Sequence, residues 1–236
     1  MISDIEFTHA FQPIIDTETG KIISYEVLLR GPHNEPPGYV FNEVENNNMM
    51  EFDQKSREQA ISLASQLGLD CSLNLNFTMG SILFDNGRYV EDTIRSAEEN
   101  GLTAKQIVVE ILESEIIDQT EDFSMVLSKL RRSGVTIAID DFGSGYAGLN
   151  MLADILPDLI KLDIHLMQNI HQDGVRQSIV RAICSLCFDL GIDILAEGVE
   201  QKEEYDFLKK QGITIYQGWL FAKPGFESFP EASFPE

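Results

Sequence analysis

Acidic side chains end several short apolar runs of this 236-residue chain. Runs of β-branched and other apolar residues are typical of buried parallel strands. A carboxylate at the end of such a strand costs free energy unless a partner offsets its charge. The runs, each with its terminal acid or acid pair, are 107–110, 137–141, 159–163 and 192–197. We therefore expect the acids to converge at one mouth of a barrel, where barrel enzymes place their chemistry.

Clustered carboxylates without His or Cys are the ligands that hard divalent cations prefer. An asparagine near the end of another strand and a lysine among the acids complete a set of candidate residues. These are Glu26, Asn74, Glu110, Asp140, Asp141, Lys161 and Glu197. The set favours two cations about 3.5–4 Å apart, which activate a water for in-line displacement at phosphorus. Mg²⁺ or Mn²⁺ fits these oxygen ligands better than Zn²⁺ does.

The adjacent acids Asp140 and Asp141 precede Phe142-Gly143-Ser144-Gly145-Tyr146. Neighbouring strand residues point to opposite faces, so both acids reach one site only where the strand has ended and the chain turns. The two glycines permit such a turn, and one acid would then bridge both cations. The alternative is an acid pair that caps the next helix. Asn74 by itself equally fits a turn or a cap.

The alternation of strands and helices predicts an α/β fold with a parallel sheet. A hairpin is expected at 11–15 and 21–29, around a Gly-containing turn. Further strands are expected at 72–77, 106–112, 135–140, 158–163, 192–196 and 213–216, and helices at 51–67, 90–100, 121–132, 146–153, 175–190 and 202–211. About eight strands favour a closed barrel. We expect one domain over residues 1–236, with its core at about 9–225 and a tail, 226–236, that is ordered only in part.

The formal charge of −22 argues against binding of nucleic acid polymers or anionic membranes. No run reaches the roughly 18 apolar residues of a membrane span, and the N-terminus lacks the features of a signal peptide. The three cysteines indicate a reduced, cytoplasmic protein. Cys184 and Cys187 lie in a helical run, where small core residues are a far better interpretation than a redox pair.

From about Phe11 to Pro224, the sequence resembles the EAL domain family, bacterial phosphodiesterases that open the second messenger cyclic di-GMP. The resemblance rests on ordered motifs: Phe11-Gln12-Pro13-Ile14, Glu26-Val27-Leu28, Asn74, Glu110 with Glu113, Asp140 to Tyr146, Lys161-Leu162-Asp163, Ala196 to Glu200 and Gln217-Gly218-Trp219. It implies a TIM-like (β/α)8 barrel, in the family's variant with an N-terminal antiparallel hairpin strand.

The resemblance also implies a role for each matching residue. The first metal would be held by Glu26, Asn74, Glu110 and Asp140, and the second by Asp140, Asp141 and Glu197. Glu197 would serve as general base and Lys161 would hold the catalytic water. Substrate contacts would come from Gln12 and Arg30, and Gln217 would support the site. Glu113 would steady the 141–146 loop, and Glu200 would be an outer acid.

The resemblance implies hydrolysis of cyclic di-GMP to linear pGpG with two Mg²⁺ or Mn²⁺ ions, and inhibition by Ca²⁺. It further implies a homodimer, linked to the site through the 141–146 loop, and regulation by a sensor domain or partner protein. The chain departs from the family pattern at Val27, Asn76 and Leu112, where alanine, serine and threonine are usual. Alternatives are a non-catalytic cyclic di-GMP receptor, a protein-interaction module and an unrelated barrel enzyme such as an aldolase.

Overall fold

The computed structural model describes residues 5–235 apart from 45–47, 117–120 and 146–147. Its strands form one sheet in the order β2-β3-β4-β5-β6-β7-β8-β1-β9, and pairing of β2 with β1 closes it into a barrel. The predicted closed barrel is therefore confirmed. The strands are β1 Thr8–Asp16, β2 Lys21–Arg30, β3 Ser72–Phe77, β4 Ile107–Leu112, β5 Thr136–Phe142, β6 Leu159–Leu162, β7 Asp193–Ala196, β8 Ile215–Tyr216 and β9 Gly225–Phe226.

The hairpin gives the barrel its one antiparallel strand. β1 runs antiparallel to both β2 and β8, while the successive pairs from β2 to β8 are parallel. The tight turn between β1 and β2 places Gly20 at φ 66, where the Gly20 amide donates to the Asp16 carbonyl at 2.9 Å. A glycine accepts this left-handed conformation without steric cost. Because the strands from β2 to β8 are parallel, all of them present their carboxyl ends at the same mouth of the barrel.

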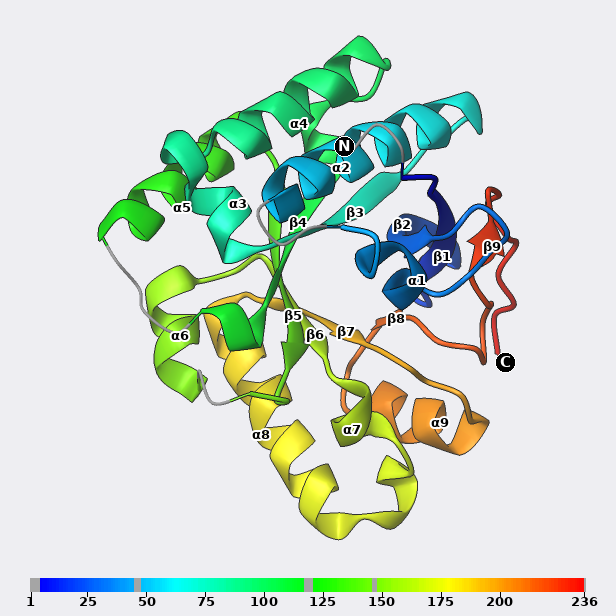
Figure 1. The fold of residues 1–236 in the computed structure, drawn as a ribbon. Coiled ribbons are helices and arrows are strands. Elements are labelled where there is room, and N and C mark those ends of the chain that lie inside the picture. Colours follow the sequence, from blue (N-terminus) through cyan, green and yellow to red (C-terminus); the bar gives the residue numbers. More distant parts are fainter. Residues whose placement is uncertain (1–4, 45–47, 117–120, 146–147, 236) are drawn as a thin grey trace.

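Helices surround the barrel, with α2, α4 and α5 along one side and α8 and α9 along another (Figure 1). Their bounds are α1 Pro37–Phe41, α2 Met49–Gln66, α3 Met79–Leu83, α4 Arg88–Glu99, α5 Glu121–Ser133, α6 Gly148–Ile155, α7 Ile164–Met167, α8 Gly174–Leu190 and α9 Lys202–Lys210. None in the described part of the chain is long and apolar enough to cross a membrane.

Helix α8 shows how local sequence sets the ends of an element. The Asp173 side chain accepts hydrogen bonds from the amides of Val175 and Arg176, and Gly191 ends the helix at φ 69. These are a standard N-cap and a left-handed C-terminal glycine. Within α8, Cys187 is buried and Cys184 half-buried, and both thiols are free, as predicted.

The described residues after Phe226 contact the hairpin. β9 pairs with β1, and the Phe229 ring stacks on Tyr25 at 4.3 Å between centroids. Phe229 also meets Phe11 edge to face at 4.9 Å. Aromatic contacts of this kind add stability beyond the area they bury, so the described tail covers the outside of the hairpin. The short helices α1, α3 and α7 were not predicted.

Candidate active site

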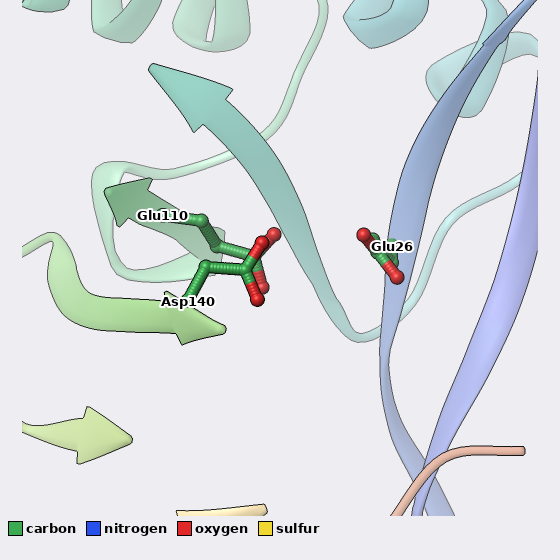
Figure 2. Close-up of side chains that lie close together, drawn as sticks. All are labelled: Glu26, Glu110 and Asp140. Atoms are coloured by element: carbon green, nitrogen blue, oxygen red, sulfur yellow. The ribbon is translucent and has the colours of Figure 1, made fainter. Parts of the chain in front are cut away.

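The candidate residues sit within successive strands of the barrel or directly after them, and Glu26 lies four residues before the end of β2. Glu26 lies on β2, Asn74 on β3, Glu110 on β4 and Lys161 on β6, while Glu197 directly follows β7. Figure 2 shows Glu110 and Asp140 side by side from neighbouring strands, with Glu26 facing them across the mouth. The interior of the barrel thus gathers residues that are up to 171 positions apart, from Glu26 to Glu197.

Lys161 lies at the centre of the acids and is fully buried. Its Nζ atom is 2.9 Å from both Glu110 Oε1 and Asp140 Oδ1, and 2.8 Å from Glu197 Oε1. Glu26 Oε1 is more distant, at 3.6 Å. The single positive charge of Lys161 therefore faces four converging carboxyl groups. The site keeps a net negative charge, which bound metal ions can neutralise.

Two groups of acids have carboxylate oxygens within 4.8 Å of one another: Glu26 with Glu110 and Asp140, and Asp140 with Asp141 and Glu197. Asp140 belongs to both groups. Oxygen clusters of this size suit Mg²⁺ or Mn²⁺. A shared carboxylate is the arrangement expected of a bridging ligand in a two-metal site.

Asn74 completes the first group. Its Nδ2 atom donates to Glu110 Oε1 at 2.8 Å, while Asn74 Oδ1 and Glu110 Oε2 are buried without a hydrogen-bond partner among the described residues. Buried polar atoms are normally paired. Two orphaned oxygens beside Glu26 and Asp140 are therefore the donor atoms that a cation in this group would use.

A β-bulge explains how the adjacent acids reach one site. Ile139 pairs with Ile160 and Phe142 with Leu162, so Asp140 and Asp141 together oppose the single residue Lys161. Asp141 has φ 54, a left-handed conformation that is uncommon outside glycine. Bulges of this kind re-aim side chains near functional sites. The bulge thus lets both adjacent acids reach the mouth of the barrel.

Burial and mutual repulsion raise the pKa of several of these acids. Burial, opposed by Lys161 and reinforced by Asp140 and Glu26, raises the pKa of Glu110 to about 8. The pKa of Asp141 is raised to about 6, mainly by burial and secondly by the charge of Asp140. Burial also holds the pKa of Glu197 well above its usual range. Burial by itself would lower the pKa of Lys161, but the surrounding carboxylates hold that pKa well above its ordinary value.

These shifts predict that protons and cations compete for the site. A carboxyl with its pKa raised to about 8 must lose a proton before it binds a cation. Affinity for Mn²⁺ is therefore expected to rise between pH 6 and pH 8, by up to roughly tenfold per pH unit for each proton displaced. Calorimetric titration in buffers of different ionisation enthalpy measures both affinity and proton release. Equal affinities at pH 6 and pH 8 would contradict the raised pKa of Glu110.

A cleft of about 290 Å³ opens above the acids. Among its described lining residues are Gln12, Gln217, Glu200 and Trp219, but not Arg30. The Arg30 guanidinium, at the end of β2, donates to the Leu29 carbonyl at 2.8 Å. Trp219 has no role among the sequence-based assignments. The residue is 58% exposed and lines the cleft with the acids, and its place in the Gln217-Gly218-Trp219 motif was the signal available in the sequence.

Gln217 and Gly218 line the cleft, and Gln217 also contacts one of the acids. Gln217 Nε2 donates to Glu26 Oε2 at 2.6 Å, and the Gln217 amide donates to the Ala196 carbonyl at 3.0 Å. At Gly218, a Cβ atom would lie 2.1 Å from the Val199 carbonyl oxygen. Only glycine permits this close approach of two backbones, which fixes Gln217 where it can orient Glu26.

The sequence matches the EAL domain family over residues 1–224. The chain belongs to the EAL domain family. An EAL protein from Vibrio cholerae O395, solved with cyclic di-GMP bound, is 41% identical and superposes with a TM-score of 0.91, covering 98% of this chain and 97% of that one.

Curated relatives of this EAL domain include two proteins of Escherichia coli. The blue light- and temperature-regulated antirepressor BluF is 33% identical over 96% of this chain and 56% of its own length. A probable cyclic di-GMP phosphodiesterase, PdeG, is 28% identical over 94% of this chain and 45% of its own length. The chain thus spans about half the length of these relatives.

The departures from the EAL pattern leave the acids in place. Val27 packs against the core on the far side of β2 while Glu26 reaches Lys161. Leu112 is half-buried, and Asn76 is exposed at the end of β3. Val27 and Glu26 thus point to opposite sides of the same strand.

Glu113 holds the loop that follows the acid pair. Its Oε2 atom accepts hydrogen bonds from the amides of Gly143 at 2.8 Å and Gly145 at 3.0 Å, and the residue is buried. Tyr146, the last residue of this EAL motif, lies outside the described residues. A buried carboxylate that accepts two amide bonds is well placed to fix the backbone beyond Asp141.

We expect Glu113→Gln to loosen this loop, because hydrogen bonds to a charged acceptor contribute about 1.5–3 kcal/mol each and those to a neutral one less. Exchange of the Gly143 and Gly145 amides should accelerate roughly tenfold or more, and Mn²⁺ affinity should fall. Hydrogen exchange read by mass spectrometry measures the loop. Glu115→Gln is the matched control, because Glu115 lies in the same turn but accepts from the Met79 amide. Equal exchange in both variants would contradict the role of Glu113.

Proposed function

We propose that this EAL domain hydrolyses cyclic di-GMP to linear pGpG with two divalent cations, Mg²⁺ or Mn²⁺. The observation that carries the proposal is the pair of acid groups that share Asp140. Family membership and a relative named as a probable cyclic di-GMP phosphodiesterase support the substrate. The intact set of acids supports catalysis over simple binding, since each acid costs stability unless a cation offsets it.

The proposed chemistry assigns each side chain a task. Bound cations would supply the positive charge that acidifies a water and stabilises the charge developing at phosphorus. Glu197 would take the proton of the attacking water, helped by its position 2.8 Å from Lys161 Nζ, which would orient that water. Attack at phosphorus would break the bond to the 3′ oxygen, which would take a proton from solvent and leave as the 3′ hydroxyl, and the phosphate would stay on the 5′ oxygen of pGpG.

The remaining residues would position the substrate. Gln12 and Trp219 line the cleft next to Glu26 and Glu197, and Gln12 Nε2 already donates to the Ala222 carbonyl at 3.2 Å. Arg30 would supply positive charge from the end of β2, where Glu26 offsets part of the cost of its burial. Together with the cations, this charge would counter the repulsion that a chain of net charge −22 exerts on an anionic substrate.

Chromatography of the products tests the proposal. Purified protein should convert cyclic di-GMP to pGpG with Mn²⁺ or Mg²⁺, and a chelator should abolish the reaction. Ca²⁺, which is larger and binds with looser geometry, should occupy the site and inhibit. Absence of pGpG under all these conditions, with cyclic di-GMP still bound, would favour the second candidate function, a non-catalytic receptor. The similarity to an antirepressor is the observation that favours that candidate.

We further propose a homodimer that uses the surface of α5 and α6. Three apolar side chains on or beside these helices are more than half exposed: Met125 at 60%, Leu149 at 63% and Leu156 at 51%. The helices lie on the same side of the barrel (Figure 1), and Arg131 of α5 donates to the Leu156 carbonyl at 2.8 Å. Exposed apolar groups of this kind often mark interfaces. Light scattering tests the homodimer: Leu149→Glu should lower the measured mass relative to the native chain. We also propose that a further domain or a partner protein regulates the activity.

A further inference from the structure

Helix α7, Ile164–Met167, leaves the barrel between the two loops that follow the second group of acids. It follows β6 after a single residue, Asp163 (Figure 1). β6 pairs with β5 on one side and with β7 on the other. β5 carries Asp140 and Asp141, and Glu197 directly follows β7. The chain that leaves β6 is therefore flanked on both sides by the backbone that holds these acids.

Leu166 of α7 packs against the loop on the β5 side. Gly143 has φ 97, and a Cβ atom there would lie 2.4 Å from Leu166 Cδ1. The leucine therefore contacts the loop backbone itself, which only glycine permits. The Gly143 amide also donates to Glu113 Oε2 at 2.8 Å. The loop two residues beyond Asp141 is thus held by a carboxylate and by an apolar side chain.

Ile164 packs in the same way against the loop on the β7 side. Gly198, directly after Glu197, has φ 62, and a Cβ atom there would lie 2.5 Å from Ile164 Cγ1 and 2.6 Å from Ile164 Cδ1. The next amide, of Val199, donates to the Gln217 carbonyl at 3.1 Å. An isoleucine in contact with the backbone next to Glu197 restricts where that carboxylate can move.

Both ends of α7 are fixed by carboxylates. The Asp163 side chain accepts a hydrogen bond from the His165 amide at 2.8 Å, which caps the start of the helix. Beyond the helix, the Asn169 amide donates to Glu204 Oε1 at 2.7 Å. Glu204 is buried, and its Oε2 atom accepts from the Glu200 amide at 3.1 Å. The helix is therefore tied to the same loop that Ile164 contacts, and its apolar side chains have a fixed base.

The acid pair on β5 needs such support from outside its own loop. Asp141 has φ 54, a conformation that costs free energy in a residue other than glycine. Such residues persist only where the surrounding structure holds them. Relaxation of the backbone at Asp141 would turn its carboxylate away from Glu197, and the contact of Leu166 with Gly143 opposes that movement.

We propose that Ile164 and Leu166 are positioning residues, which together set the spacing between Asp141 and Glu197 in the second group of acids. Leu166 fixes the loop after β5 and Ile164 fixes the loop after β7, and α7 keeps the two contacts at a set separation. The proposal rests on the proposed function in one respect, that these acids hold a cation. It adds that two apolar side chains, which cannot bind a cation themselves, decide how tightly that cation is held.

Hydrogen exchange in the presence of a chelator tests the contacts without any cation. Ile164→Ala should accelerate exchange in the peptide that covers 197–200 roughly fivefold or more, and leave 142–145 at the native rate. Leu166→Ala should accelerate 142–145 and leave 197–200 unchanged. Equal acceleration of both loops in either variant, or acceleration of neither, would overturn the proposal.

Calorimetric titration with Mn²⁺ tests the consequence for the site. Each variant should bind one of two ions about tenfold or more weakly than the native protein and the other with native affinity. Matched controls lie on α8: Ile179 is 43% exposed against 37% for Ile164, and Leu186 is half-buried like Leu166. Ile179→Ala and Leu186→Ala should keep both affinities. Native affinities in the two α7 variants, or equal losses in the controls, would refute the positioning role.

Kinetics separates positioning from general loss of structure. At saturating Mn²⁺, Ile164→Ala should lower kcat roughly 10–100-fold and change KM for cyclic di-GMP less than about threefold, because misplacement of a reacting group acts on the chemical step. Ile164→Val keeps the Cγ1 atom that lies nearest Gly198 and should keep close to the native kcat. A loss in Ile164→Val as large as that in Ile164→Ala would contradict the contact.

Failure of this inference and failure of the proposed function give different results. A native protein that binds two Mn²⁺ ions but forms no pGpG would refute the hydrolysis, while weaker Mn²⁺ binding by the α7 variants would still support the positioning role. A native protein that forms pGpG, with α7 variants that bind Mn²⁺ and turn over like it, would refute the positioning role alone.

Discussion

Replacement of Glu197 by glutamine is expected to lower turnover of cyclic di-GMP by roughly a thousandfold, within the range of 10²–10⁴ that a positioned general base contributes. Glu197 directly follows β7, and its Oε1 atom lies 2.8 Å from Lys161 Nζ. Glutamine keeps the shape and one oxygen of the side chain but cannot accept the proton of the attacking water. Much of the substrate binding should therefore survive.

Single-turnover chromatography measures the rate of the chemical step, and calorimetry with cyclic di-GMP and Ca²⁺ measures substrate binding. Asp193→Asn is a matched control, because Asp193 begins the same strand, β7, at the opposite end of the barrel. It should retain the native rate within a factor of about two. Turnover of Glu197→Gln at the native rate would show that another group removes the proton.

Most of the site could be predicted because strand ends carry their own signal. An apolar run that stops at an acid locates both a strand and its carboxyl end, and parallel strands bring those ends together. Glu110, Asp140 and Glu197 are found in this way from local sequence. The existence of each long element was also predictable, since helix and strand periods differ, and α8 and β3 lie within one residue of their expected bounds.

The rest depends on contacts between residues distant in the sequence. Nothing local indicates that Phe229 stacks on Tyr25, so this contact between the tail and the hairpin could not be predicted. The bulge that sets Asp140 and Asp141 opposite Lys161 depends on the register between β5 and β6, which pairing of whole strands decides. The contacts of α7 with the loops after β5 and β7 likewise depend on how those loops pack against it.

Lys161 is a further example of a contact that the sequence does not show, because the sequence places it among acids but does not show that it contacts three of them within 2.9 Å.

We expect Lys161→Met to destabilise the metal-free protein by about 3–5 kcal/mol, since it leaves buried carboxylates without their counter-charge. For a domain of this size the loss corresponds to roughly 10 °C in Tm. The loss should be larger at pH 8 than at pH 6, because Glu110, with its pKa raised to about 8, is protonated at the lower pH.

Thermal unfolding with a chelator and with Mn²⁺ tests this. Mn²⁺ should raise the Tm of Lys161→Met by more than that of the native protein, because cations then replace the missing charge as well as occupying the site. Lys202→Met is the control, since Lys202 forms an ion pair with Asp206 at 3.3 Å with both side chains about half exposed, and exposed pairs contribute little. If Lys161→Met has the same Tm as the native protein in chelator, the prediction is wrong, and enough of the acids are protonated for the cluster to be stable without the charge of Lys161. The cluster would then be a neutral network until cations bind, and Lys161 would be needed for the reaction alone.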